Sequence, residues 1–199
     1  FLINLYMLSI IIPLRNEIDN LENIKDDFNK NLKNINFEVI LVNDFSSDET
    51  FQKANEIAKG NKNFKVFDNK KKGLGGAINL GIKKTIGDYI CIMMADLSDD
   101  FNDLKNYYFK IKDNNLDAVF GSRFTKKSKV IDYPFKKLVL NRIFNIIVQI
   151  LFLNKYNDYT NAFKIYKAKV LKNMLPLVSE SFNIFLEIPL KIISRKYSY

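Results

Sequence analysis

Residues 89–100 read Tyr-Ile-Cys-Ile-Met-Met-Ala-Asp-Leu-Ser-Asp-Asp, an apolar run that stops abruptly at carboxylates. Two earlier stretches follow the same plan: residues 10–17 (Ile-Ile-Ile-Pro-Leu-Arg-Asn-Glu) and residues 39–48 (Val-Ile-Leu-Val-Asn-Asp-Phe-Ser-Ser-Asp). A continuous apolar run bounded by turn residues is typical of a strand buried on both faces of a parallel sheet. The carboxyl ends of such strands meet at one sheet edge, where open α/β sheets bind ligands. Several acids at that edge suggest a metal ion and a diphosphate.

Along the whole chain, expected strands alternate with expected helices. Strands are expected near residues 8–12, 37–42, 63–67, 88–94 and 116–120, and helices near 17–33, 48–59, 76–85, 100–112, 138–153 and 180–194. Alternating strands and helices predict a Rossmann-like α/β sandwich with a mainly parallel central sheet flanked by helices. Without a linker or an internal repeat, we expect a single domain over residues 1–199. Residues 1–6 are expected to be extraneous, and the C-terminus to be truncated.

The amino-acid composition limits the classes of function that the protein can have. An apolar content of 47% in 199 residues supports a full core and excludes a disordered chain. There is no histidine, so the usual neutral-pH base and zinc ligand are missing. The single cysteine, Cys91, lies in an expected buried strand and favours a reducing compartment. A net charge of +9 predicts anionic partners, but no nucleic-acid-binding signature accompanies it, so we expect no nucleic acid.

The ends of the first two expected strands carry groups that could bind a nucleoside. Pro13 ends ladder donation and leaves Arg15 and Glu17 in an exposed loop that can hold a nucleoside. The carboxylate of Asp44 can accept a hydrogen bond from a base N–H. Residues 73–76 (Gly-Leu-Gly-Gly) precede a helix, so their backbone N–H groups, that of Gly73 included, can approach a phosphate. The same glycines are equally compatible with a turn that packs closely against a helix.

Asp96 is the expected metal ligand, since Mg²⁺ or Mn²⁺ takes oxygen ligands from one or two carboxylates plus substrate phosphates. Met94 stands two residues earlier and its thioether does not suit a hard cation, so Ser98, Asp99 or the diphosphate must complete the site. Asp99 and Asp100 are also suited to the start of the next helix.

Residues 138–153 form the most apolar segment, yet Asn141, Asn145 and Gln149 recur every four residues and share one helical face. At about sixteen residues the segment is shorter than the ~20 needed to span a bilayer. It is therefore either a core helix or a helix in the membrane interface. The basic residues that precede it favour an anionic membrane surface.

The order and spelling of seven motifs resemble the family 2, GT-A-type glycosyltransferases, most closely the dolichyl- or polyprenyl-phosphate sugar transferases. They are residues 12–17, 42–50, 72–77, 87–90, 95–97, 121–123 and 158–164. The resemblance implies a GT-A-like fold and a nucleoside diphosphate sugar bound by Pro13, Arg15, Glu17, Asp44, Gly73, Ala95 and Asp96, where Arg15 takes a position at which the family commonly has an aromatic residue.

The resemblance also implies residues for the transfer step. Arg123 and Arg142 match positions that hold the leaving diphosphate or the acceptor phosphate, a task that suits the planar arginine fork. Asp158 matches a carboxylate that orients or deprotonates the acceptor. Where the family has an Asp-x-Asp motif, Met94 replaces the first acid.

Together these observations predict an inverting, metal-dependent transfer of a sugar to polyprenyl or dolichyl phosphate. The protein is expected at the cytoplasmic face of the membrane, held peripherally or by an anchor beyond residue 199. Two alternatives stay open: a family 2 enzyme with a saccharide acceptor, for which Asp158 would be a true base, and a non-catalytic fragment that binds nucleotide sugars or membranes.

Overall fold

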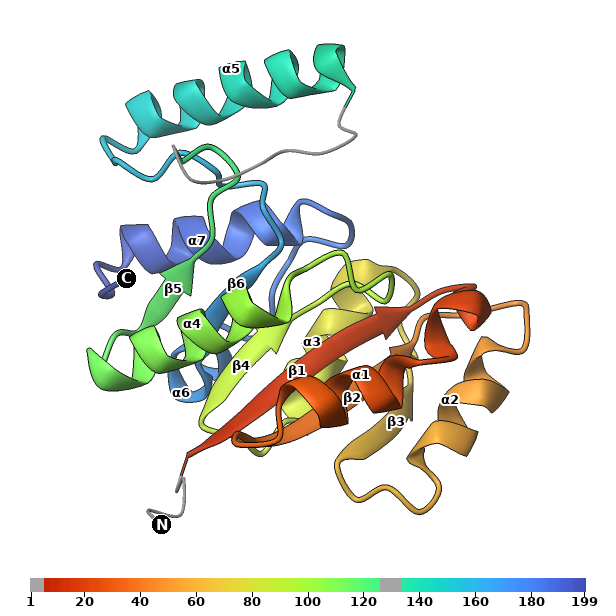
Figure 1. Ribbon diagram of the computed structural model, residues 1–199. Coiled ribbons are helices and arrows are strands. Elements are labelled where there is room, and N and C mark those ends of the chain that lie inside the picture. The colour runs from red at the N-terminus through yellow and green to blue at the C-terminus, as the bar shows by residue number, and fades with distance from the viewer. Residues whose placement is uncertain (1–5, 126–133) are drawn as a thin grey trace.

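The structure is a computed structural model and describes residues 6–125 and 134–199. Its centre is a six-stranded sheet with the order β3-β2-β1-β4-β6-β5 (Figure 1). The strands are β1 (Met7–Leu14), β2 (Asn36–Asn43), β3 (Phe64–Asp68), β4 (Tyr89–Ile92), β5 (Ala118–Phe120) and β6 (Lys164–Lys167). The helices are the 3-10 turn η1 (Ile18–Leu21), α1 (Ile24–Asn31), α2 (Thr50–Ala58), α3 (Leu74–Lys84), α4 (Phe101–Asp113), α5 (Phe135–Leu151), α6 (Ala168–Lys172) and α7 (Ile184–Ser194).

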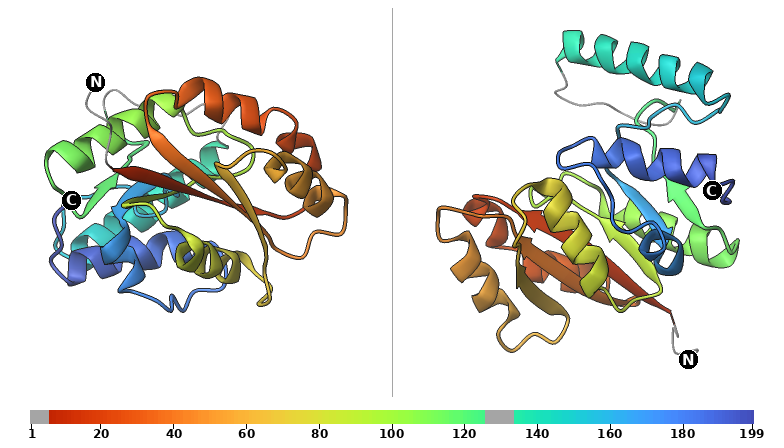
Figure 2. Two further views of the ribbon diagram at one scale, coloured as in Figure 1. Left: turned by 90° about the horizontal axis from the view of Figure 1, so that it is seen from below. Right: turned by 180° about the vertical axis from the view of Figure 1, so that it is seen from behind.

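Helices cover both faces of the sheet (Figure 2). In β1, Leu8, Ile10 and Ile12 point into the core shared with α1 and α4. Ile11, between them, points into the opposite core, which α3, α6 and α7 complete. The alternation explains why the strand is apolar at every position except Ser9: both of its faces are buried. The predicted α/β sandwich with a mainly parallel sheet is confirmed, because β1 pairs in parallel with β2 and β4, and β2 with β3.

Two local expectations were wrong. The helix expected over residues 17–33 is split into η1 and α1, and the N–H of Asn20 bonds to the carbonyl of Glu17 in a tight turn. The strand β6 was not expected, yet it pairs antiparallel with both β4 and β5. Its first residue, Lys164, is fully buried, which a sequence pattern that places lysine at the surface does not anticipate.

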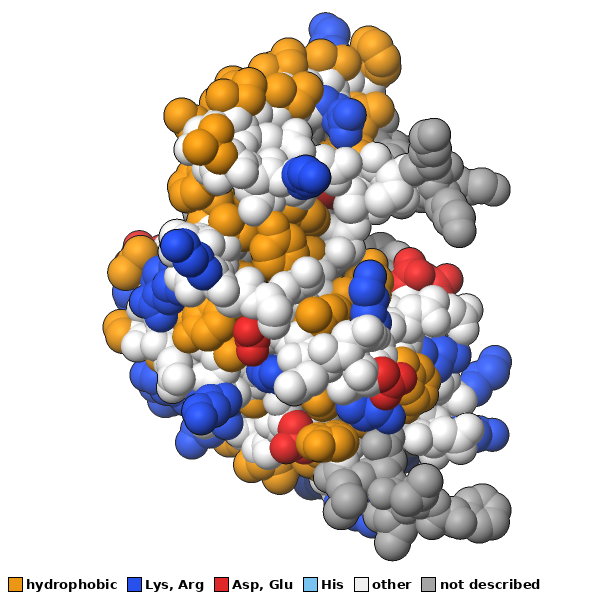
Figure 3. Space-filling model, turned by 90° about the vertical axis from the view of Figure 1, so that its left-hand side faces the viewer, with side chains coloured by type: hydrophobic (Ala, Val, Ile, Leu, Met, Phe, Trp, Pro, Cys, Tyr) orange, Lys and Arg blue, Asp and Glu red, His pale blue; other side chains and the backbone are white. Residues whose placement is uncertain are grey.

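Helix α5 lies apart from the sheet and its flanking helices (Figure 1). Within it only Asn145 and Val148 are buried. Hydrophobic side chains gather on its outer surface at the top of Figure 3, and the most exposed are Phe135, Leu140, Ile150 and Leu151. No helix within the described residues is long and apolar enough to cross a membrane.

Candidate active site

One edge of the sheet collects the polar segments. The parallel pairing places the carboxyl ends of β1, β2 and β4 together, as the sequence predicts. Because β6 runs in the opposite direction, its first residue, Lys164, pairs with Phe120, the last residue of β5. The segment after β5 and the segment before β6 therefore reach the same edge. They bring Arg123 and Asp158 to the side where the chain leaves β4.

Pro13 lies near the end of β1, where the pairing with β4 stops. The carbonyl of Ile11 accepts from Met93 N on the β4 side, and the carbonyl of Leu14 accepts from Asp44 N on the β2 side. Pro13 faces the β4 side and has no N–H to donate, so the ladder between β1 and β4 ends with the pairing of Ile11 and Ile92. Arg15, which follows, is exposed, and Glu17 is half-buried.

The loops after β1 and β2 are joined to each other. Asn16 and Phe45 both have φ 57°, a left-handed conformation that is unfavourable for residues with a Cβ atom. The N–H of Asn16 donates to Ser46 Oγ (3.1 Å), and the N–H of Ser47 donates to Asn16 Oδ1 (2.8 Å). Asn16 therefore connects the two loops, and the turn at Phe45 keeps a geometry that glycine favours.

Asp44 is buried and held by two donors. Its Oδ1 accepts from Asn69 Nδ2 (2.9 Å) and from Gly73 N (2.8 Å). The preceding residue, Asn43, donates instead to Asp68 Oδ1 (2.9 Å), and this bond is the main cause of the lowered pKa of Asp68. Asn69 was missed in the sequence. The same signal, polar residues directly after an expected strand, would have identified it.

The glycine-rich turn packs closely against another segment. Gly73 N is bonded to Asp44, and Gly75 N donates to the carbonyl of Glu180 (3.0 Å). A Cβ atom on Gly75 would lie 1.9 Å from the carbonyl oxygen of Ser179. Of the two interpretations of this turn, close packing fits, because these two N–H groups already have protein partners. Gly73 acts on the site by holding the carboxylate of Asp44.

The acids after β4 divide into different roles. Asp100 caps α4 by accepting from Asn102 N (2.5 Å), so it belongs to the helix. Asp96 is exposed and its Oδ1 accepts from Ser98 N (3.1 Å), which orients the carboxylate. Asp99 is half-buried. Ala95 is buried in the core and its side chain does not reach the site.

Asp96 and Asp99 together fit a divalent cation. Burial, and then the charge of Asp96, raise the pKa of Asp99 to about 6, while Arg123 acts in the opposite direction. A pair of carboxylates that repel each other is stabilised by a hard cation. Among residues 6–125 and 134–199, no group of three or more acids, histidines or cysteines could hold a metal alone. The donor set is therefore one that oxygens of a bound diphosphate would complete.

Arg123 and Asp158 form a forked ion pair. Arg123 Nη2 lies 2.7 Å from Asp158 Oδ1, and Arg123 Nε lies 2.9 Å from Asp158 Oδ2. The backbone N–H of Arg123 donates to the same Oδ2 (2.8 Å), and Nη2 also donates to Thr160 Oγ1 (3.1 Å). Asp158 is completely buried, whereas the side chain of Arg123 is 31% exposed. The carboxylate thus fixes a guanidinium that still reaches the surface of the site.

Lys164 supports the turn that carries Asp158. Its buried Nζ donates to the carbonyl of Tyr159 (3.2 Å) and to that of Asn161. Burial lowers the pKa of Lys164 to about 7, an effect that Asp158 opposes and Arg123 reinforces. In the sequence Lys164 stood out only as the last residue of the motif at 158–164, and its buried support of the turn was missed.

Arg142 reaches the site from α5. Its Cζ lies 4.5 Å from the centre of the Phe124 ring, and the Cζ of Arg123 lies 5.4 Å from the same ring. Both guanidinium groups lie against the same aromatic ring, so two permanent positive charges border this part of the structure. Such a pair suits a phosphate group, the ligand class predicted for both arginines.

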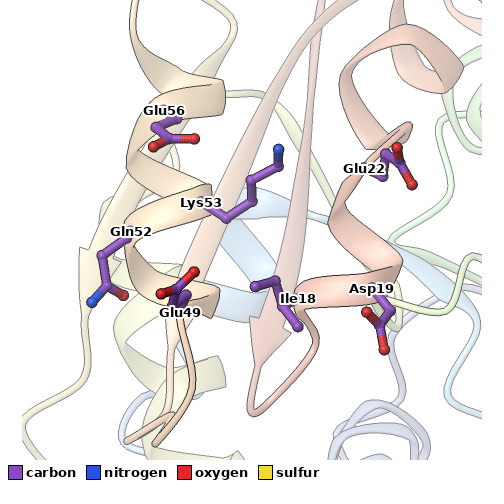
Figure 4. Close-up of a pocket in the computed structure, with 7 residues that line it drawn as sticks. All are labelled: Ile18, Asp19, Glu22, Glu49, Gln52, Lys53 and Glu56. Atoms are coloured by element: carbon purple, nitrogen blue, oxygen red, sulfur yellow. The ribbon is translucent and has the colours of Figure 1, made fainter.

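A cavity of about 300 Å³ lies between η1 and α2 (Figure 4). Its lining residues are Ile18, Asp19, Glu22, Glu49, Gln52, Lys53 and Glu56. Four of these seven side chains are acidic, so the cavity repels a diphosphate. None of the predicted site residues lines it. The candidate site is instead the open edge of the sheet between Asp44, Asp96 and Arg123.

Comparisons with known proteins identify relatives of this chain. Dolichol-phosphate mannosyltransferase of Pyrococcus furiosus is 34% identical over 134 residues, which is 67% of this chain and 38% of that protein. Dolichyl-phosphate beta-glucosyltransferase of Dictyostelium discoideum is 29% identical over 188 residues, which is 87% of this chain and 57% of that protein. The chain thus spans about half the length of these curated relatives, or less.

Solved structures share the fold. Glucosyl-3-phosphoglycerate synthase from Mycobacterium tuberculosis, in complex with Mn²⁺, uridine diphosphate and phosphoglyceric acid, has a TM-score of 0.73 at 14% identity. The similarity covers 96% of this chain and 65% of that one. The family model described as Glycosyl transferase family 2 matches residues 9–175. The chain therefore belongs to glycosyl transferase family 2, as its motifs indicated.

Proposed function

We propose that the protein transfers a sugar from a nucleoside diphosphate sugar to a dolichyl or polyprenyl phosphate, with inversion at the anomeric carbon. The observation that carries the proposal is the single sheet edge that receives the strand ends followed by Asp44 and Asp96 together with the Arg123–Asp158 pair. The two curated relatives, which are named for dolichol-linked transfers, support the same acceptor class.

The donor half of the proposed site lies at the ends of β1, β2 and β4. Asp44 is held in place by Asn69 and Gly73 and offers an acceptor to a base N–H. Pro13, Arg15 and Glu17 border the nucleoside on the β1 side. Asp96 and Asp99, with Ser98 between them, hold Mg²⁺ or Mn²⁺ against the diphosphate. When bound, the ion neutralises charge on the departing diphosphate.

The acceptor half favours a phosphate over a sugar hydroxyl. A hydroxyl needs a base to take its proton, whereas a lipid phosphate arrives already ionised. Both oxygens of Asp158 are engaged by Arg123, so this carboxylate is better suited to positioning than to proton transfer. Arg123 and Arg142 neutralise and aim the attacking or departing phosphate.

Transfer assays test the proposal. The full-length protein is incubated with each common nucleoside diphosphate sugar and Mg²⁺ or Mn²⁺, with polyprenyl phosphate, with saccharides, or with neither. We expect a lipid-linked sugar only when polyprenyl phosphate is present. Product on saccharides alone would favour surface-polysaccharide synthesis, and binding without turnover with either acceptor would leave the non-catalytic alternative.

The proposal places the protein at the cytoplasmic face of a membrane, with α5 in the lipid interface. The exposed side of α5 is apolar, and Lys136 and Lys137 are exposed at its start. Basic residues near the anionic cytoplasmic leaflet contribute about 1 kcal/mol each to binding. Lys126 and Lys127, which we also predicted to contact lipid, lie outside the described residues.

Charged substitutions on α5 should abolish membrane binding. We expect Leu140→Glu and Ile147→Glu, at positions 67% and 50% exposed, to stop flotation with anionic vesicles, because each places a carboxylate in the lipid interface. Charge reversal at Lys136 and Lys137 should weaken flotation most at low salt. Ile86→Glu is the matched control, since Ile86 is 67% exposed but precedes β4. Equal flotation of all variants would contradict an interfacial α5.

A further inference from the structure

Helix α5 is packed with its polar face inward. Asn145 is only 1% exposed, although most of the helix is exposed and apolar. The sequence places Asn141 and Gln149 on the same side, and both are half-buried. A buried amide is retained at low cost only when its hydrogen bonds are made, so the partners of these side chains decide where the helix sits.

Those partners form a continuous path to Arg123. Asn145 Oδ1 accepts from Tyr159 N (2.6 Å), and Asn145 Nδ2 donates to Asn141 Oδ1 (2.6 Å). Asn141 in turn bonds with Thr160 Oγ1 at 3.0 and 3.1 Å. Thr160 Oγ1 accepts from Nη2 of Arg123 (3.1 Å). Each link is a directional hydrogen bond between 2.6 and 3.1 Å, so a shift of the helix moves the hydroxyl that contacts the guanidinium.

Within the described residues, this hydrogen-bonded path is the main contact that fixes the position of α5, because its other contacts are fewer or less directional. Gln149 donates to the backbone of Lys155 (3.1 Å), close to the end of the helix. The exposed Arg142 lies against the Phe124 ring, a contact without the directionality of a hydrogen bond. Val148 is the single buried apolar residue of α5.

We propose that Asn141 and Asn145 are positioning residues that fix the position of the Arg123 guanidinium through Thr160. The position of α5 on the protein therefore determines the geometry of the site of transfer. The inference rests on the proposed function, because it assigns Arg123 to a phosphate of that reaction. It adds that the helix proposed to contact lipid is also a part of the catalytic geometry. Neither asparagine touches the substrate.

Asn141→Ala in the full-length protein tests the path. Alanine is favourable in a helix and position 141 is half-buried, so folding should be retained. We expect kcat for transfer to polyprenyl phosphate in vesicles to fall by roughly 10- to 100-fold, the scale of a small misplacement of a catalytic group. The KM for the nucleotide sugar and vesicle flotation should not change. Gln149→Ala, which removes an amide from the same side of α5 away from Thr160, should keep wild-type kcat.

A double-mutant cycle with Thr160→Val shows whether Asn141 and Thr160 affect the transfer rate through one path or independently. If both residues act through one path, Asn141→Ala combined with Thr160→Val should be no slower than the slower single variant. Additive losses, or an Asn141→Ala variant within twofold of wild type, would overturn the positioning role. If the wild type makes no lipid-linked sugar, the proposed function and this inference both fail. If the wild type is active and the cycle is additive, only this inference fails.

Discussion

Replacing Arg123 by Ala is expected to lower the rate of sugar transfer by about 10³-fold, the lower range for arginines that stabilise a transferring phosphoryl group. The change removes a permanent positive charge from beside Asp99 and leaves Asp158 without its forked partner. Single-turnover rates at saturating donor measure the effect. Arg123→Lys should recover only part of the rate, because a point charge cannot grip two oxygens of a phosphate in one plane.

Stability has to be measured alongside, because Arg123→Ala leaves a buried carboxylate unpaired. Breaking such a pair costs roughly 3–5 kcal/mol, and the partial exposure of Arg123 favours the lower value. Arg195→Ala, an exposed arginine just after α7, serves as the matched control and should be active. A folded Arg123→Ala protein that transfers sugar within tenfold of wild type would remove Arg123 from the mechanism.

The same assay separates the two acceptor classes. If the acceptor is a lipid phosphate, Asp158→Asn should act by loosening Arg123, and the variant should be slower at every pH. If the acceptor is a sugar hydroxyl, Asp158 must accept a proton, and Asp158→Asn should lose the acidic limb of the pH–rate profile. Loss of that limb would reverse our choice of a lipid phosphate.

Replacing Asp96 by Ala is expected to abolish the gain in nucleoside diphosphate affinity that Mg²⁺ or Mn²⁺ gives the wild type. Transfer should also fall by about 10³-fold, which corresponds to the several kcal/mol that a bound ion contributes to charge stabilisation. The reason is that Asp99 would be the single remaining carboxylate of the proposed pair, and no group of three or more acids, histidines or cysteines among the described residues could hold the ion instead. Calorimetry with and without metal measures the affinity.

Asp100→Ala is the matched control for this change. Asp100 lies in the same loop and is also exposed, but its carboxylate caps α4. Loss of the cap should cost about 1 kcal/mol of stability and leave metal-dependent binding intact. Metal-dependent binding that survives Asp96→Ala and not Asp100→Ala would contradict the assignment of the metal ligand.

The strands that carry the acids were predictable because they are buried on both faces. Burial of that kind favours apolar residues along most of each strand, and the carboxylates of Asp44 and Asp96 stand out just after the apolar runs. Parallel pairing then brings the strand ends together with no further information. This part of the site depends on local sequence and on one topological rule.

The second half of the site depends on contacts between distant residues. The strand β6 begins and ends in lysine, and Lys164 is buried only because carbonyl groups of the preceding turn receive its ammonium group. For α5, periodicity identified the residues that share a face but not the face that packs inward. The backbone N–H of Tyr159, which donates to Asn145 Oδ1, decides that question.

The antiparallel pairing of β5 and β6 has a consequence for how such a protein can diversify. The chain leaves the sheet at Phe120 and returns at Lys164, directly opposite, so the 43 residues between them form an excursion whose ends are tied by the sheet. Doubling the length of a loop adds only about 0.6 kcal/mol of closure entropy. An excursion of this kind can be lengthened, shortened or exchanged while the donor side, built on β1 to β4, keeps its geometry. Acceptor choice and membrane attachment would then evolve together as one exchangeable unit, and nucleotide recognition would be inherited separately.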